Sequence, residues 1–109
     1  MIQITIYQGH EKEYKRFRCI GHSGYSESGS DIICAAVSIL VINTMNSIEE
    51  FTSTKLQVKA DEDTGLIDCR LVGSIDHDTE LLIRTMILGL QGIQEDYGND
   101  YIILNFKEV

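Results

Sequence analysis

The chain has 109 residues, 43% of them hydrophobic, which is enough for one compact domain with a core and too short for two. Seventeen carboxylates against nine Lys and Arg give a net charge of −8, which disfavours direct nucleic-acid binding and suits a basic partner, although solubility alone would also explain it. Three cysteines, whose spacing matches no disulfide or metal pattern, indicate reduced thiols, a cytoplasmic protein and no metal or other cofactor.

The first segment alternates in hydrophobicity. Ile2, Ile4 and Ile6 share one face, which is the period of a half-buried strand. Residues 8–12 are typical of a hairpin turn, and Tyr14–Ile20 is predicted as a second strand that pairs antiparallel with the first. No signal peptide or membrane segment is expected, because the longest apolar stretch, residues 32–42, is too short to cross a bilayer.

A loop and a long helix come next. Residues 21–30 hold three glycines and four serines, a composition typical of a loop. The helix is predicted from Ile32 to about Phe51, with Ser30 or Asp31 as its N-cap. Its first three turns are apolar on almost every side, so either a sheet and a second helix cover it or it forms a subunit interface.

The second half repeats this arrangement. Lys55–Ala60 and Leu66–Val72 are predicted strands joined by a turn, with Cys69 inward like Cys19 of the second strand, and both thiols are interpreted as core. A second helix from about residue 76 or 78 to Asp96 and a last strand, 101–106, complete the order β-β-α-β-β-α-β. We therefore expect one domain, 1–109, with an α+β fold, a mixed α/β sandwich in which one sheet packs against two helices.

Cys34 is the most informative residue. It follows Asp31 by three positions, in the predicted first turn of the long helix. Free N–H groups and the positive end of the helix dipole favour a thiolate there, which is the attacking form of cysteine. The same N–H groups could stabilise an oxyanion. The alternative is that Cys34 is a small hydrophobic core residue.

His22 is the candidate base for Cys34. It follows Gly21 at the end of the second strand, and the start of the next element should lie close by. Asp31 either orients His22 or caps the helix. Ser38, one turn after Cys34, either lines the site or hydrogen-bonds back to the helix. His10 and His77 have no metal-binding partner at a useful spacing.

Gly21-His22, the glycine-bearing loop and the segment Asp31–Ser38 together resemble the ribosomal-processing cysteine proteases of Gram-positive and related bacteria. The resemblance covers essentially the whole chain. It implies a His22–Cys34 dyad, a homodimer and a flexible loop over the site that includes Ser23, Gly24, Tyr25 and Gly29, with Gly21 beside it. It also implies a substrate: the precursor of large-subunit ribosomal protein twenty-seven, cut after a hydrophobic, Phe-containing stretch.

Two other functions stay open at this point. The chain could be a non-enzymatic module that binds a basic ribosomal protein during ribosome assembly. It could also be a redox-sensing thiol protein, but no second cysteine is expected near Cys34 to resolve an oxidised sulfur.

Overall fold

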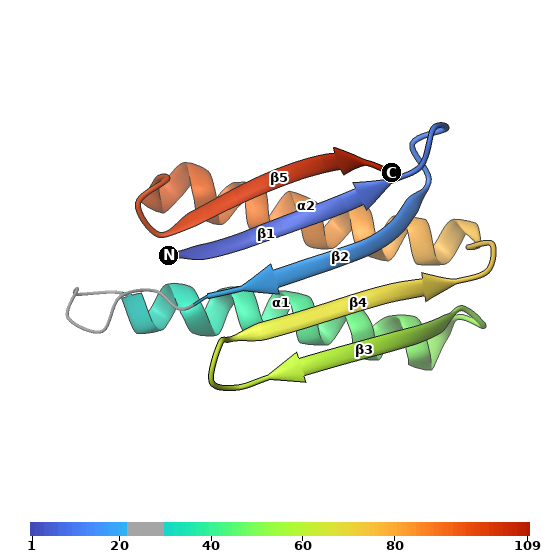
Figure 1. Ribbon diagram of the computed structural model, residues 1–109, viewed down its shortest axis with the longest axis horizontal. Helices are drawn as coiled ribbons and strands as arrows, with labels where there is room; N and C mark the ends of the chain where they lie inside the picture. Colours follow the sequence, from blue (N-terminus) through green and yellow to red (C-terminus); the bar gives the residue numbers. More distant parts are fainter. Residues whose placement is uncertain (22–29) are drawn as a thin grey trace.

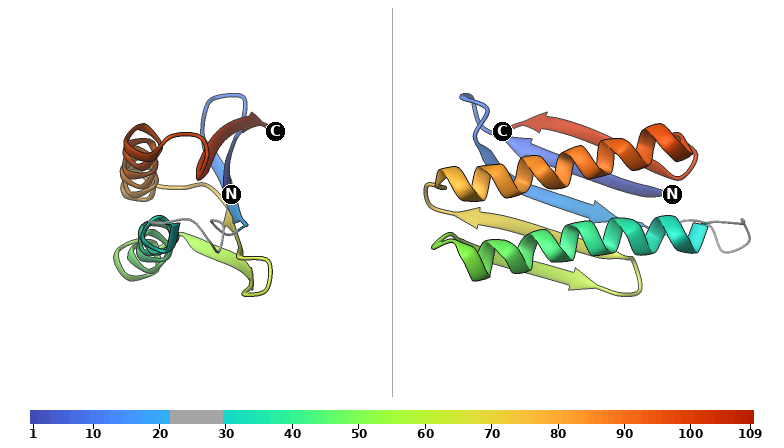
Figure 2. Two further views of the ribbon diagram at one scale, coloured as in Figure 1. Left: turned by 90° about the vertical axis from the view of Figure 1, so that its left-hand side faces the viewer. Right: turned by 180° about the vertical axis from the view of Figure 1, so that it is seen from behind.

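Strands and helices follow one another in the predicted order in the computed structural model, which describes residues 1–21 and 30–109 (Figure 1). Both helices lie on the same face of a single sheet, as the two views of Figure 2 show. The fold is therefore the expected α+β arrangement of one sheet against two helices. The elements are β1 (Ile2–Gln8), β2 (Tyr14–Ile20), α1 (Ser30–Phe51), β3 (Lys55–Asp61), β4 (Leu66–Val72), α2 (His77–Tyr97) and β5 (Ile102–Glu108).

The strand order in the sheet is β3-β4-β2-β1-β5, which sequence patterns did not resolve. β1 pairs antiparallel with β2, as predicted, and parallel with β5. β2 pairs antiparallel with β4, which joins the first hairpin to the second. In this antiparallel pair Cys19, near the end of β2, lies opposite Ile67, near the start of β4. The end of β2 therefore lies beside the turn between β3 and β4.

The core lies between the sheet and the helix layer. Ile2, Ile4 and Ile6 are at most 2% exposed, and Cys69 is fully buried. Each large apolar side chain buried in this way contributes roughly 1.5–3 kcal/mol. The edge strand β3 contributes less to this core. Leu56 is half-buried, but Val58 is 44% exposed because this strand lies at the margin of the helix layer.

The sheet and the antiparallel α2 together cover α1, which was one of the two expected arrangements. A buried stripe at helical spacing faces them. Its β-branched residues are weak helix formers, so tertiary burial stabilises this helix more than intrinsic propensity does. The stripe consists of Ile33, Val37, Val41, Met45 and Ile48.

Length and composition alone would let Ile32–Phe51 of α1 cross a membrane. The core helix of a globular domain meets the same criterion, and one face of α1 packs into the core described above. The opposite face keeps apolar residues exposed, among them Ile32 at 66% and Ile39 at 67%.

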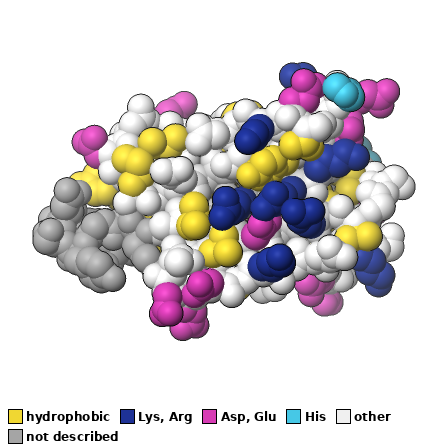
Figure 3. Space-filling view, in the orientation of Figure 1, with side chains coloured by type: hydrophobic (Ala, Val, Ile, Leu, Met, Phe, Trp, Pro, Cys, Tyr) yellow, Lys and Arg dark blue, Asp and Glu magenta, His cyan; other side chains and the backbone are white. Residues whose placement is uncertain are grey.

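No helix of the described residues covers the other face of the sheet, and Lys and Arg side chains gather over the middle of that face (Figure 3). Arg16 is anchored there. Its Nε donates to Asp68 Oδ1 at 2.7 Å, its Nη2 bonds to Asp68 Oδ2, and its guanidinium lies 4.7 Å from the centre of the Tyr7 ring. The hydrogen bond from Arg16 is the main reason that the pKa of the Asp68 carboxyl lies below its usual value.

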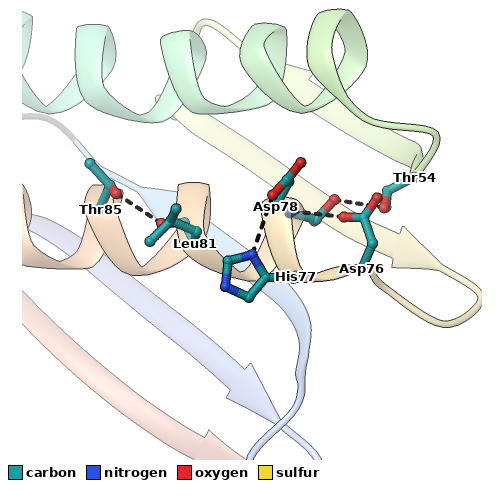
Figure 4. Close-up of polar contacts among 7 residues, drawn as sticks. Thr54, Asp76, His77, Asp78, Leu81 and Thr85 are labelled. Carbon is teal, nitrogen blue, oxygen red and sulfur yellow. Dashed lines mark hydrogen bonds and ion pairs between the residues drawn. The ribbon is translucent and has the colours of Figure 1, made fainter.

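Helix α2 begins with an acidic N-cap, Asp76. Asp76 accepts a hydrogen bond from the Thr79 backbone N–H at 2.8 Å, and the Thr79 hydroxyl pairs with that of Thr54 at 2.7 Å (Figure 4). These contacts tie the start of α2 to the segment that follows α1. Gly98, with φ of 84°, is the C-cap of the helix.

Candidate active site

A cleft of about 350 Å³ opens at the end of the molecule where α1 begins. Residues of α1, the start of β1, the end of β2 and the β3–β4 hairpin around its turn form the wall of the cleft. Most of the lining is apolar, and it also includes two thiols, one hydroxyl and two carboxylates. The lining comprises Ile2, Cys19, Gly21, Cys34, Val37, Ser38, Ile42, Ala60, Asp61, Glu62, Gly65, Leu66 and Ile67.

Cys34 lies in this cleft and is only partly buried. The helix begins at Ser30, two residues earlier than predicted, so Ser30 and Asp31 are helical residues and Cys34 is the fifth residue rather than part of the first turn. Periodicity did not show this because both added residues are polar. The first four N–H groups of a helix lack partners within it, so any free oxyanion donors of α1 precede Cys34.

Gly21 lines the same cleft, and its conformation requires glycine. Its φ is 101°, and a Cβ added there would lie 2.3 Å from the Met1 carbonyl oxygen. Its N–H donates to the Thr64 carbonyl at 3.0 Å, which fastens the end of β2 to the β3–β4 turn. The residue before His22 is therefore held at the wall of the cleft that contains Cys34.

Several predicted site residues lie outside the described part of the chain. They are His22, Ser23, Gly24, Tyr25 and Gly29, together with the side chain of Asp31. The roles predicted for them stay predictions. Ser38 does line the cleft beside Cys34, in agreement with one of its two predicted roles.

The two other histidines lie at the opposite end of the molecule. His10 is in the β1–β2 turn, where its Nδ1 is 3.4 Å from Glu108 Oε1. His77 begins α2, with its Nδ1 3.3 Å from Asp78 Oδ1 (Figure 4). The chain has three histidines, so His22 is the remaining imidazole that could serve Cys34.

The two other thiols are buried, as predicted. Burial is the main reason that the pKa of Cys19 rises to about 11 and that of Cys69 to about 12, so both stay protonated at neutral pH. One expectation was wrong: Cys19 lines the cleft that also contains Cys34, so a second thiol does lie near the candidate nucleophile. The pairing of β2 with its neighbours, which local sequence does not reveal, places it there.

Sequence reasoning missed the contribution of the β3–β4 turn. Asp61 and Glu62 were interpreted as ordinary turn residues, but both line the cleft. No local signal identifies them, because their proximity to Cys34 depends on β4 pairing with β2. They add negative charge to an otherwise apolar cavity.

Comparison with known proteins gives consistent results. The family model described as cysteine protease Prp matches residues 1–102. The ribosomal processing cysteine protease Prp of Staphylococcus aureus (strain Mu50) is 32% identical over 107 residues, covering 98% of this chain and all of the relative.

Two crystal structures of the S. aureus ribosomal processing protease Prp are also similar to this chain. The complex with a substrate peptide has a TM-score of 0.90 at 31% identity, and the complex with a covalently linked product peptide has a TM-score of 0.88 at 32% identity. Each alignment covers 98% of this chain and all of the other.

Proposed function

Since this chain belongs to the cysteine protease Prp family and is a cysteine protease, we propose that it removes the N-terminal extension of a ribosomal protein precursor. In this proposal Cys34 is the nucleophile and His22 is the base. The precursor is that of large-subunit ribosomal protein twenty-seven, and the reaction takes place in the cytoplasm. The observation that carries the proposal is the cleft that holds Cys34 beside Gly21. Because the chain belongs to a cysteine protease family, the alternative of a non-enzymatic binding module is rejected.

Exposure and location support Cys34 as the nucleophile. It is the thiol that is both only partly buried and in the cleft, whereas Cys19 and Cys69 are buried and protonated. A covalently linked product peptide is present in the similar S. aureus protease. Nucleophilic catalysis by cysteine passes through such a covalent bond.

The reaction follows from these groups. His22 takes the Cys34 proton, and the thiolate sulfur bonds to the scissile carbonyl carbon. As the C–N bond breaks, the imidazolium returns the proton to the leaving amine nitrogen, which leaves a thioester. Water then gives a proton to the imidazole and attacks the thioester carbon. As the C–S bond breaks, the imidazolium returns its proton to the sulfur, which restores the Cys34 thiol, and the acid product leaves as a carboxylate after losing its proton to solvent.

The lining of the cleft supports a substrate with an apolar segment next to basic residues. Ile2, Val37 and Ile42 offer an apolar wall for a hydrophobic stretch that contains Phe, while Asp61 and Glu62 would attract Lys or Arg of the same peptide. Ribosomal proteins are commonly basic because they bind a polyanion. The net charge of −8 attracts them as well.

The precursor itself provides the test. Mass spectrometry after incubation with this enzyme should show one shortened product and one released N-terminal peptide that ends after the hydrophobic stretch. A precursor in which that stretch is replaced by Ser and Gly serves as the control and should stay intact. An unchanged precursor mass, or cleavage scattered along the chain, would contradict the proposed function.

We also propose that the enzyme is a homodimer that associates through the exposed apolar side of the helix layer. Ile39 on α1 is 67% exposed and Leu88 on α2 is 71% exposed. A stable dimer buries about 800 Å² per partner, and side chains of this kind supply such area. Sedimentation should show a dimer that Ile39→Asp dissociates and that Phe106→Asp, a matched change on β5, does not. A monomeric wild type contradicts the proposal.

A further inference from the structure

Two rows of side chains run across the uncovered face of the sheet. Strand register defines them, because directly paired residues project to the same face. The first row is Gln57, Arg70, Arg16, Tyr7 and Lys107. The second row is Lys59, Asp68, Arg18, Thr5 and Asn105. Together these two rows are called the cationic band below, and Figure 3 shows its Lys and Arg over the middle of the face.

The charge of the cationic band is opposite to that of the chain. It holds five Lys and Arg against one carboxylate, which leaves four cations and sixteen carboxylates in the rest of the sequence. The expectation that this protein does not bind nucleic acid rests on the net charge, which is summed over the whole chain. At an ionic strength near 0.15 M the Debye length is about 8 Å, so a ligand on this face senses mainly the local charge.

The cations of the band are only partly neutralised. Asp68 binds Arg16, and it lies 4.0 Å from Arg18 Nε, which is buried and has no hydrogen-bond partner among the described residues. Within the described part of the chain, Arg70 and Lys59 form no ion pair, although both line a cleft of about 690 Å³ over β2, β3 and β4. Four cations therefore remain for a ligand: Arg18, Lys59, Arg70 and Lys107.

The shape of the band suits a linear polyanion. Five neighbouring strands at about 4.8 Å spacing make it roughly 19 Å long, and two rows about 7 Å apart make it narrow. Arginine binds phosphate through two parallel N–H donors, and Arg is the commonest cation here. Open sheet faces also serve as platforms for single-stranded RNA. Tyr7 is the band's one aromatic residue and is engaged by Arg16, so phosphate contacts should outweigh base stacking.

We propose that the cationic band binds the phosphate backbone of RNA, independently of base sequence. The choice of RNA over another polyanion rests on the proposed function, since the substrate proposed above is a ribosomal protein, a class of protein that binds RNA. The band lies on the sheet face away from the helices, and none of its ten residues is among the described residues that line the catalytic cleft. Docking on RNA would bring the enzyme to its substrate without using the active site.

Fluorescence anisotropy with a labelled 20-nucleotide oligouridylate tests the proposal. We expect micromolar binding at low salt and a slope of log K against log salt of about −3, since each of four neutralised phosphates of a single strand contributes about −0.7. The double variant Lys59→Glu/Arg70→Glu should bind at least about tenfold more weakly, with a slope near −1.5. The matched control, Lys12→Glu/Arg84→Glu, makes the same charge change at two exposed residues outside the band and should retain binding.

The proposal would be overturned if the wild type did not bind the oligouridylate at low salt, or if the two double variants lost the same amount of affinity for it. Equally tight binding of polyglutamate would also overturn it and would indicate an acidic protein partner. Both double variants should cleave a free precursor peptide at the wild-type rate. RNA binding without cleavage would refute the proposed function alone. Cleavage without RNA binding would refute this inference alone.

Discussion

Cys34→Ala will lower the rate of precursor cleavage by at least about 10⁴-fold, because the other thiol in the described lining of the cleft, Cys19, is buried and stays protonated. The fold should survive, since Cys34 is only partly buried and alanine is a strong helix former. The measurement is cleavage under single-turnover conditions, together with thermal unfolding of the same preparation.

Cys69→Ala is the matched control. It also removes a sulfur, but from a fully buried site that does not line the cleft. It should lower stability by roughly 1–2 kcal/mol through a small cavity while retaining cleavage per folded molecule. If Cys34→Ala cleaves the precursor at the wild-type rate, Cys34 is not the nucleophile.

His22→Ala should lower cleavage by about 10²–10⁴-fold, the range expected when a general base is removed. The prediction depends on the positions of the other imidazoles. His10 and His77 lie against Glu108 and Asp78 at the opposite end of the molecule and cannot replace it. Accordingly, His10→Ala and His77→Ala should retain wild-type activity and serve as controls.

Alkylation provides a readout that a loss of folding would not reproduce. Iodoacetamide at neutral pH should modify Cys34 and spare Cys19 and Cys69, whose burial raises their pKa values to about 11 and 12. In His22→Ala the labelling of Cys34 should slow while the other two thiols stay unmodified. Unchanged labelling of Cys34 would mean that His22 does not activate it, and labelling of Cys69 would instead reveal unfolding.

The candidate site was only partly predictable for a physical reason. Gly21 and Cys34 carry local signals, namely a glycine at a strand end and a thiol near a helix start, and the structure places both at one cleft. Asp61 and Glu62 carry no such signal. They reach the cleft because β4 pairs with β2, a contact between residues about fifty positions apart. The same pairing brings Cys19 to the cleft, which sequence reasoning did not anticipate.

By itself, the sequence determined the order and approximate bounds of all seven elements, the inward faces of the central strands and the family, because periodicity, turn residues and motif spacing are local properties. Only the tertiary structure decided the strand order, the true start of α1 two residues before its predicted one, the acidic side of the cleft and the cationic band. These features arise from strand register and helix placement, which join residues far apart in the chain. The net charge cannot reveal the acidic side of the cleft or the cationic band, because it carries no information about where the charges lie.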